Sequence, residues 1–319
     1  MPVFEMPLSE LKRYKGTNPC PEDFDEYWSR AIDEMSNMDP CIELVPADFK
    51  TPAADCFDLY FTGVKNARIH AKYLRPKNCP EPHPAVLIFH GYSLNSGDWM
   101  DKLNYISNGF SVVALDCRGQ GGSSEDSGAV KGSTLKGHII RGIDDEPDNL
   151  LFRQIFLDTA QLASIVMEMS EVDEDRVGVT GGSQGGGLTL ACAALEPRIK
   201  RLAPLFPFLS DYKRTWEMDL AKDAYAELIY YFRSFDPTHS HEEEIFTKLG
   251  YIDIQHLANR IRGEVLMGTG LMDMICPPST QFAAYNKIES KKNMLMYPDY
   301  KHENLPGFQD RVFQFLLEL

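Results

Sequence analysis

One serine between glycines, Ser183, is the residue of this chain best suited to nucleophilic chemistry. It stands in Gly181-Gly-Ser-Gln-Gly185, which fits the G-x-S-x-G pattern. A β-branched run at 177–180 precedes the pattern, and an apolar, alanine-rich run at 188–195 follows it. Strand, tight turn and helix is the context that presents such a serine as a nucleophile. The alternative is a glycine-rich junction with a capping serine, because serine is also a good N-cap.

A serine hydroxyl needs a base, and the base needs an acid to orient it. Two later apolar runs, 265–270 and 293–297, are predicted strands, and Asp273 and His302 lie just beyond them. The chain order Ser, Asp, His is one of the orders in which such triads occur on parallel sheets. We therefore expect His302 to take the proton of Ser183, with Asp273 fixing the tautomer of His302.

Other residues of the same types compete for these roles. Asp299 also precedes His302, but it lies too close along the chain to occupy a separate loop. His239 and His241 lie in a polar stretch without carboxylate or cysteine spacing typical of a metal site, so we expect surface histidines. Glu303 is predicted to start a helix, because acidic residues favour first turns.

Acyl transfer also needs donors for the oxyanion that forms in the transition state. The backbone N–H of Gln184, directly after the nucleophile, is the expected first donor. The apolar run 84–89 ends in His90-Gly91, and the N–H of Tyr92 is the expected second donor. Each such donor is typically worth roughly 3 kcal/mol. We expect His90 to pack and hydrogen-bond beneath this loop.

Two motifs, R-G-Q-G and G-x-S-Q-G-G, are more specific than G-x-S-x-G alone. They lie in Asp116-Cys-Arg-Gly-Gln-Gly-Gly-Ser-Ser124 and Gly181-Gly-Ser-Gln-Gly-Gly186, and the chain also has His302-Glu303 near its C-terminal end. Together with the N-terminal stretch containing Pro19, Asp23, Phe24 and Trp28, and with the segment 270–280, they resemble the acetyl xylan esterase and cephalosporin C deacetylase group, carbohydrate esterase family seven. The resemblance extends over almost the whole chain.

This resemblance implies an α/β-hydrolase fold and deacetylation of small acetylated sugars and related acetyl esters. It implies a Ser183, Asp273, His302 triad, with Tyr92 and Gln184 as oxyanion donors. Members of the group are typically intracellular, metal-independent and hexameric, so we expect no cofactor, no metal and a homo-oligomer. In the R-G-Q-G motif, we expect Arg118 to pair with a carboxylate and support neighbouring loops.

The composition is that of a globular enzyme. The chain has 319 residues, of which 43% are hydrophobic, and a net charge of −15. This charge disfavours nucleic acid and anionic membranes as partners. No run approaches the roughly 18 apolar residues of a membrane span, and no signal peptide is recognisable at the N-terminus. Seven scattered cysteines then indicate reduced thiols and a cytoplasmic location. Packing roles are expected for Cys117 and Cys276.

The elements expected before the nucleophile form an arm and the first half of a sheet. The arm, residues 1–45, contains a helix at 23–35 with one apolar side. Strands at 56–62 and 68–73 are expected to pair antiparallel. From Ala85 onward strands and helices alternate, which predicts a mostly parallel sheet. A long, largely apolar helix is expected at 150–169.

The segment after the strand near Leu202 is expected to form a helical cap insertion at about 207–262. Helices are predicted at 219–235 and 242–249, and their aromatic residues are expected mainly to pack the cap onto the core. The cap is expected to shape the substrate pocket. The chain as a whole, 1–319, is expected to be a single α/β-hydrolase domain with a mostly parallel central sheet flanked by helices.

The sequence therefore predicts a serine carboxylesterase that forms an acetyl-enzyme. Expected substrates are small acetylated saccharides such as xylo-oligosaccharides, and acetyl esters such as cephalosporin C. A broader acyl esterase and a peptidase of the prolyl oligopeptidase type remain alternatives. A catalytically silent α/β-hydrolase that serves in binding is an alternative of another class.

Overall fold

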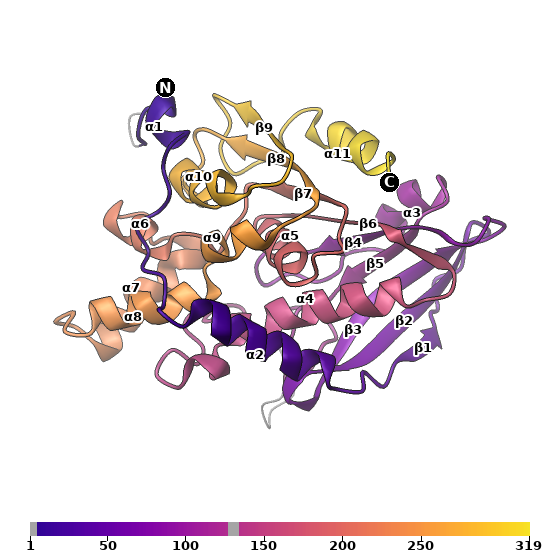
Figure 1. Ribbon diagram of the computed structural model, residues 1–319, viewed down its shortest axis with the longest axis horizontal. Coiled ribbons are helices and arrows are strands. Elements are labelled where there is room, and N and C mark those ends of the chain that lie inside the picture. The colour runs from indigo at the N-terminus through magenta and orange to yellow at the C-terminus, as the bar shows by residue number, and fades with distance from the viewer. Residues whose placement is uncertain (1–4, 127–133) are drawn as a thin grey trace.

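A nine-stranded sheet forms the centre of the computed structural model, which describes residues 5–126 and 134–319 (Figure 1). The strand order across the sheet is β1-β2-β3-β5-β4-β6-β7-β8-β9. The strands are β1 (Glu43–Pro46), β2 (Ala54–Gly63), β3 (Ala67–Pro76), β4 (His83–Phe89), β5 (Ser111–Leu115), β6 (Val172–Gly182), β7 (Arg201–Leu205), β8 (Glu264–Gly270) and β9 (Lys292–Tyr297).

The first three strands are antiparallel, and the pairing of β2 with β3 confirms the prediction from the sequence. β2 and β3 pair along their whole length, from Ala54 opposite Pro76 to Gly63 opposite Ala67. The edge strand β1 was not predicted, because all four of its residues are exposed and give no alternating pattern. This part of the sheet joins the remainder through antiparallel pairing of β3 with β5.

The other pairings, from β5 and β4 through to β9, are all parallel. β4, β5 and β7 are almost entirely buried, which explains why they appear in the sequence as continuous apolar runs. Parallel strands end at a common edge of the sheet. The loops after β4, β6, β8 and β9, which carry the predicted site residues, therefore leave the sheet at that edge.

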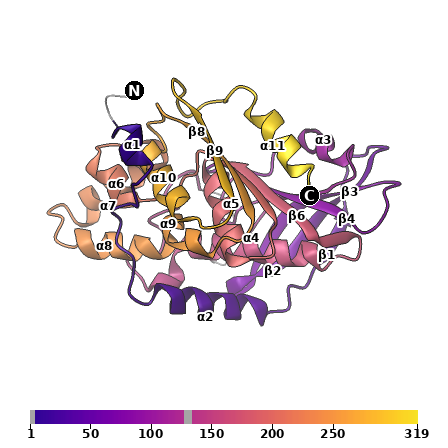
Figure 2. The same cartoon turned by 45° about the horizontal axis from the view of Figure 1, so that its top comes forward.

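Helices cover both faces of the sheet. Figure 2 shows α3 and α11 on one side of the strands, with α2 and α4 on the other. α5 packs against α4 and against β6 and β7. The helix α4 is buried on nearly its whole circumference, because it lies between the sheet and α2. The bounds of these helices are α2 (Phe24–Ser36), α3 (Leu103–Ile106), α4 (Leu151–Met167), α5 (Gln184–Leu195), α10 (Pro278–Lys287) and α11 (Phe308–Leu316).

Between β7 and β8 the chain forms a group of helices at one end of the sheet, on the left in Figure 1. We call residues 207–262 the cap. Its helices are α6 (Tyr212–Glu217), α7 (Ala226–Phe235), α8 (Glu242–Leu249) and α9 (Ile254–Leu257). The prediction of one helix over 219–235 was wrong at its start. Asp219 and Asp223 have φ values of 56° and 51°, and a right-handed helix cannot continue through left-handed residues.

The N-terminal arm lies along the cap and the core. It contains α1 (Leu8–Leu11) and the predicted helix, observed as α2. Asp211, a buried cap residue, accepts hydrogen bonds from the Tyr14 hydroxyl (2.7 Å) and from the backbone N–H groups of Thr17 and Asn18 (3.0 and 2.8 Å). This one carboxylate therefore fastens the arm to a segment almost 200 residues away.

Short 3-10 helices complete the described chain: η1 (Val64–Asn66), η2 (Met100–Lys102), η3 (Pro147–Asn149), η4 (Asp223–Tyr225), η5 (Gly250–Ile252) and η6 (Ala258–Arg260). Within residues 5–126 and 134–319, no helix has the length and hydropathy needed to cross a lipid bilayer.

Candidate active site

Ser183 occupies a sharp turn between β6 and α5. Its φ and ψ are 57° and −119°, a strained conformation for a residue with a Cβ. The turn is fixed by hydrogen bonds from the Ser183 N–H to Leu205 O and from the Phe208 N–H to Ser183 O, each 3.0 Å. The side chain is only partly buried, so the hydroxyl lies within reach of a substrate.

Glycines on both sides of Ser183 let the strand, the turn and the helix approach closely. A Cβ on Gly185 would lie 2.1 Å from Phe89 O, and a Cβ on Gly181 would lie 2.6 Å from the same oxygen. These are overlaps with backbone atoms, which cannot rotate away. Both glycines of the predicted pattern are therefore required sterically.

Asp273 and His302 meet in space, although 29 residues separate them. His302 Nδ1 lies 2.8 Å from Asp273 Oδ2. The other carboxylate oxygen, Oδ1, accepts hydrogen bonds from the N–H groups of Ile275 and Cys276, both 2.9 Å. Asp273 is completely buried, while the His302 side chain is 17% exposed and packs against the Phe206 ring at 4.2 Å between centroids. Asp273 is thus a buried acid fixed by hydrogen bonds, and it is paired with His302, a partly exposed base that a substrate can approach.

Cys276 lies beside this pair. Donor atoms of Asp273, Cys276 and His302 lie within 4.8 Å of one another, a spacing that a metal ion could use. The contacts favour proton transfer instead, because backbone amides and His302 already occupy both Asp273 oxygens. Burial and the Asp273 carboxylate raise the pKa of the Cys276 thiol, with the Ser183 hydroxyl acting in the opposite direction. Cys276 is therefore a neutral, buried neighbour of Ser183.

The two predicted oxyanion donors lie at the start of α5 and in the loop after β4. Gln184 is the first residue of α5, where backbone N–H groups have no partner within the helix. Among the described residues, no backbone or side-chain acceptor takes the Tyr92 N–H. Both amides are thus available to an incoming oxygen, and the positive end of the α5 dipole adds to the effect.

Gln120 joins the segments that carry these two donors. Gln120 and Gln184 exchange two side-chain hydrogen bonds, and both side chains are buried. Gln120 Oε1 also accepts from the N–H of Ser93, the residue after Tyr92 (2.9 Å). The R-G-Q-G motif is predicted to support neighbouring loops, and these contacts show that Gln120 holds the loop after β4 and the start of α5.

The remaining parts of the predicted site have structural roles. His90 Nε2 accepts from the Cys117 N–H (3.0 Å) and its Nδ1 bonds Gly91 O (2.8 Å), while burial lowers the pKa of the ring. Arg118 forms a buried pair with Asp158, at 2.7 Å for its Nε. The predictions of a packing role for His90 and of a carboxylate partner for Arg118 are confirmed.

The competing residues lie elsewhere. His239 and His241 are exposed, in agreement with the prediction. Glu303 was wrongly predicted to start a helix: the last helix begins at Phe308, after Pro306 and a left-handed Gly307, and Glu303 instead accepts the N–H of Lys301 at 3.0 Å.

One buried residue near the site was missed entirely. Glu227, on α7 of the cap, accepts a hydrogen bond from the Tyr92 hydroxyl and others from the N–H groups of Ile139 and Ile140. Burial raises the pKa of this carboxyl, and the hydrogen bonds that it accepts act in the opposite direction. No local pattern marks a glutamate whose partner lies 135 residues earlier.

Comparison with known proteins places this arrangement in a family. The sequence profile of the acetyl xylan esterase family (AXE1) matches residues 1–319. The fold is similar to that of acetyl xylan esterase 1 from Thermoanaerobacterium sp. JW/SL YS485, with 66% identity, a TM-score of 0.95 and coverage of 98% of this chain and 99% of that one. It is also similar to the acetyl xylan esterase from Paenibacillus sp. R4, with 36% identity, a TM-score of 0.91 and the same coverage.

A longer relative is also named as an acetyl esterase. The acetyl esterase Axe7A of Xylanibacter ruminicola is 28% identical over 290 residues, which make up 88% of this chain. The chain spans 63% of that relative's length. The profile matches the full length of the chain, and both solved structures are similar to it over 98% of its residues. The chain belongs to the acetyl xylan esterase family of α/β-hydrolases.

Proposed function

We propose that this protein is a serine carboxylesterase that removes acetyl groups from small acetylated saccharides, such as xylo-oligosaccharides, and from acetyl esters such as cephalosporin C. The observation that carries the proposal is the 2.8 Å contact between His302 and buried Asp273, in a chain whose strained Ser183 turn fits a nucleophile. Membership of the acetyl xylan esterase family supports the acetyl group as the acyl part.

In the first half of the reaction, the Ser183 hydroxyl oxygen attacks the acetyl carbonyl carbon. Its proton passes to His302, and Asp273 stabilises the imidazolium. The carbonyl oxygen becomes an oxyanion that accepts hydrogen bonds from the backbone N–H groups of Tyr92 and Gln184. The bond between the carbonyl carbon and the alcohol oxygen then breaks, and the alcohol leaves with the proton from His302.

In the second half, water replaces the alcohol. His302 takes a proton from the water, whose oxygen attacks the acetyl-enzyme carbonyl. The same two amides stabilise the second oxyanion. Breakdown of this intermediate releases acetic acid, which ionises to acetate, and His302 returns the proton to Ser183. The cycle balances without a cofactor.

Labelling of the nucleophile tests the proposal. A fluorophosphonate should inactivate the protein with one equivalent bound, and peptide mass spectrometry should locate the label on Ser183. Substitution of Ser183→Ala should abolish both labelling and hydrolysis of 4-nitrophenyl acetate. Absence of labelling in a folded wild-type sample would favour a non-catalytic binding role. Labelling with hydrolysis of peptides in preference to acetyl esters would favour the peptidase alternative.

We also propose that the protein acts as a homo-oligomer, a hexamer by resemblance to its family. The edge strand β1 supports self-association, since Leu44 and Val45 on this strand expose 41% and 38% of their surface and Ile42, just before it, exposes 45%. Native mass spectrometry should detect hexamers at micromolar concentration. A monomer under these conditions would contradict the proposal. An assembly with narrow access should favour short oligosaccharides over polymeric xylan.

A further inference from the structure

Glu227 is a charged residue type in an unusual environment. It lies on α7 of the cap with only 3% of its surface exposed. Its Oε2 accepts the N–H groups of Ile139 and Ile140, at 2.7 and 3.0 Å, and its Oε1 accepts the hydroxyl of Tyr92. These donors come from two loops, neither of which belongs to the cap.

The donors around Glu227 are a hydroxyl and backbone amides, and none of them is a cation. Among residues 5–126 and 134–319, no lysine, arginine or histidine forms an ion pair with this carboxylate. Burial of a carboxylate without a charged partner is unfavourable unless good hydrogen bonds offset the loss of hydration. An apolar side chain here would leave the Tyr92 hydroxyl and the N–H groups of Ile139 and Ile140 without this acceptor. Glu227 therefore holds donors from two separate loops at one point of the cap.

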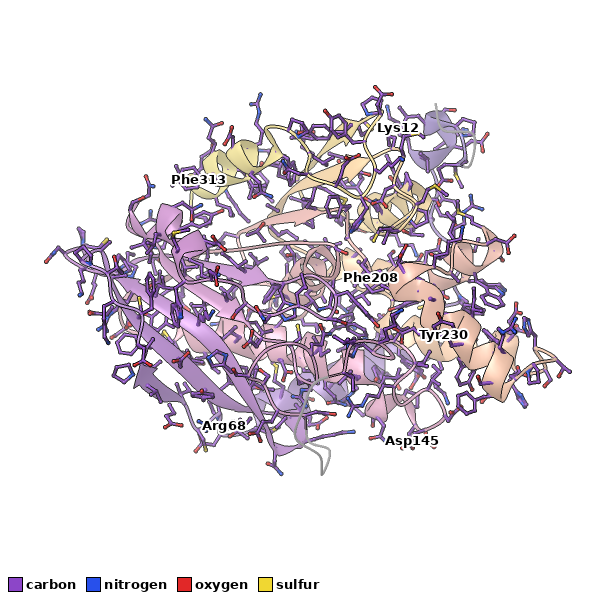
Figure 3. All side chains as sticks on the ribbon, turned by 180° about the vertical axis from the view of Figure 1, so that it is seen from behind. Lys12, Arg68, Asp145, Phe208, Tyr230 and Phe313 are labelled. Atoms are coloured by element: carbon purple, nitrogen blue, oxygen red, sulfur yellow. The ribbon has the colours of Figure 1, made fainter. Side chains whose placement is uncertain are left out.

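Tyr92 links the cap to the proposed oxyanion hole. Its backbone N–H is a proposed oxyanion donor, while its ring extends toward the cap and packs against Phe208 and His138, at 5.7 and 4.9 Å between centroids. Figure 3 shows Phe208 where the central sheet meets the cap helices, and Tyr230 marks α7 further out. One side chain thus connects the donor amide with α7.

The opposite side of this loop is already held by the core, because Gln120 accepts the Ser93 N–H at 2.9 Å. The Ser93 hydroxyl also donates to Leu135 O (2.6 Å), in the loop that leads to the Glu227 partners Ile139 and Ile140. The Tyr92 amide therefore lies between two anchors. Gln120 fixes the segment after it, and Glu227 fixes the end of its side chain.

We propose that Glu227 is a positioning residue for the esterase reaction, which holds the Tyr92 N–H in the oxyanion hole through the Tyr92 hydroxyl and thereby makes the cap part of the catalytic geometry. This inference rests on the proposed function, because it takes Tyr92 as an oxyanion donor. The side-chain hydrogen bonds of Glu227 go to Tyr92, Ile139 and Ile140, so its effect on the site passes through Tyr92. Loosening of this contact should lower kcat while leaving ground-state binding unchanged.

The same helix offers a matched control. Tyr231, also on α7, donates to Asp144 at 2.5 Å. This contact likewise joins the cap to the segment around residue 140 through a tyrosine and a carboxylate, but it does not include the oxyanion loop. The substitution Tyr231→Phe removes a hydrogen bond of the same kind from the same helix.

The test compares Tyr92→Phe, Glu227→Gln, the double variant and Tyr231→Phe in the full-length protein. Tyr92→Phe keeps both the ring and the backbone N–H and removes only the hydroxyl. Four quantities are measured for each variant: kcat and KM for 4-nitrophenyl acetate, the inhibition constant of a small boronic acid, and the melting temperature. The boronic acid forms a tetrahedral adduct on serine, whose oxygen needs the oxyanion donors.

We expect Tyr92→Phe to lower kcat by about tenfold with KM unchanged, a smaller loss than the roughly 100-fold to 1,000-fold of a deleted oxyanion donor. The boronic acid should bind more weakly by a similar factor. The double variant should be no worse than Tyr92→Phe, because the hydroxyl through which Glu227 acts is already absent there. Tyr231→Phe should remain within about twofold of the wild type in kcat and in boronic acid binding.

Two results would overturn this inference. The first is a Tyr92→Phe variant with the kcat of Tyr231→Phe. The second is a loss of kcat with undiminished boronic acid binding. If Glu227→Gln fails to fold, Tyr92→Phe alone decides between these outcomes. Ser183→Ala in the same assay separates the two proposals: activity in that variant refutes the proposed function itself, whereas an inactive Ser183→Ala beside a normal Tyr92→Phe refutes only the role of Glu227.

Discussion

The carboxamides of Gln120 and Gln184 face each other and exchange two hydrogen bonds, of 2.9 and 3.0 Å, across 64 residues of sequence. Their orientation is determined by the chain, since the Ser93 N–H needs an acceptor and therefore fixes the Gln120 oxygen toward the loop after β4. The nucleophile turn and that loop are thus joined by side-chain amides, in addition to the close approach of Gly185 to the backbone of Phe89 and His90. This bridge makes the R-G-Q-G motif part of the support of the proposed oxyanion hole.

Removal of the bridge should impair the chemical step. We expect Gln120→Ala to lower kcat by roughly 10-fold to 100-fold, because small displacements of a catalytic group have effects of this size. KM should change little. Gln120→Glu retains acceptors for the Ser93 N–H and the Gln184 amide, but adds a negative charge near the oxyanion, and should also lower kcat. Steady-state kinetics at one pH measure kcat and KM for both variants. A Gln120→Ala variant with the kcat of the wild type would contradict a role of the Gln120–Gln184 bridge in the chemical step.

The acid of the proposed triad is testable by an isosteric change. Asp273→Asn keeps the shape of the side chain but presents an amide to His302 Nδ1, which favours the wrong tautomer of the ring. We expect kcat to fall by about 10,000-fold, as for the corresponding change in other triads. Asp299→Asn is the matched control, since Asp299 is a nearby exposed aspartate. A similar loss in both variants would refute the assignment of Asp273.

The pair Arg118 and Asp158 should contribute to stability rather than to catalysis. Both side chains are almost fully buried. Asp158→Asn leaves the guanidinium without a counter-charge, which typically costs about 3–5 kcal/mol in the free energy of unfolding. The exposed pair Arg68 and Glu43, at 2.9 Å, is the control, and Glu43→Gln should cost less than about 1 kcal/mol. Urea unfolding measures both; equal costs would contradict this account.

A buried histidine predicts a dependence of stability on pH. His70 lies between two carboxylates, with Asp116 at 2.7 Å from Nδ1 and Asp58 at 2.9 Å from Nε2. Burial lowers the pKa of His70, but the hydrogen bonds and charges of Asp116 and Asp58 outweigh it, so the pKa lies above its ordinary value. The folded state therefore holds this proton more tightly than the unfolded chain does.

The sign of the effect follows from this raised pKa. The stabilising contribution of His70 is complete below about pH 6.5, the ordinary histidine value, and is lost as the pH rises through the folded-state pKa. The melting temperature of the wild type should thus fall between pH 6 and pH 9. His70→Gln should have a lower melting temperature at pH 6 and a smaller fall toward pH 9. An equal fall in both proteins would exclude His70 as its source.

Much of the fold was predictable because its signals are local. The run at 177–180, the glycines around Ser183 and the apolar segment after them describe strand, turn and helix within 20 residues. The antiparallel pair β2 and β3 also followed from neighbouring residues. By contrast, β1 has no buried side chain, and the break before α7 depends on the left-handed conformation of Asp219 and Asp223, which no local pattern of the sequence indicates.

In the candidate site, too, the residues with local sequence signals were predictable and the others were not. Ser183, Asp273 and His302 could be selected because each lies just beyond a predicted strand, in an order that constrains the choice. The residues that support these three could not be selected in this way, because the contact of Glu227 with Tyr92 joins residues 135 positions apart. Such pairs have no periodicity, and only the folded chain brings them together.

The most direct test of the central claim is a chain-length series of 4-nitrophenyl esters, from acetate to octanoate, with the wild type and Ser183→Ala. We predict a sharp preference of the wild type for acetate and loss of that activity in the variant. A preference for longer acyl chains would retain the serine mechanism but contradict the acetylesterase assignment. Activity that survives in a folded Ser183→Ala variant would contradict the mechanism itself.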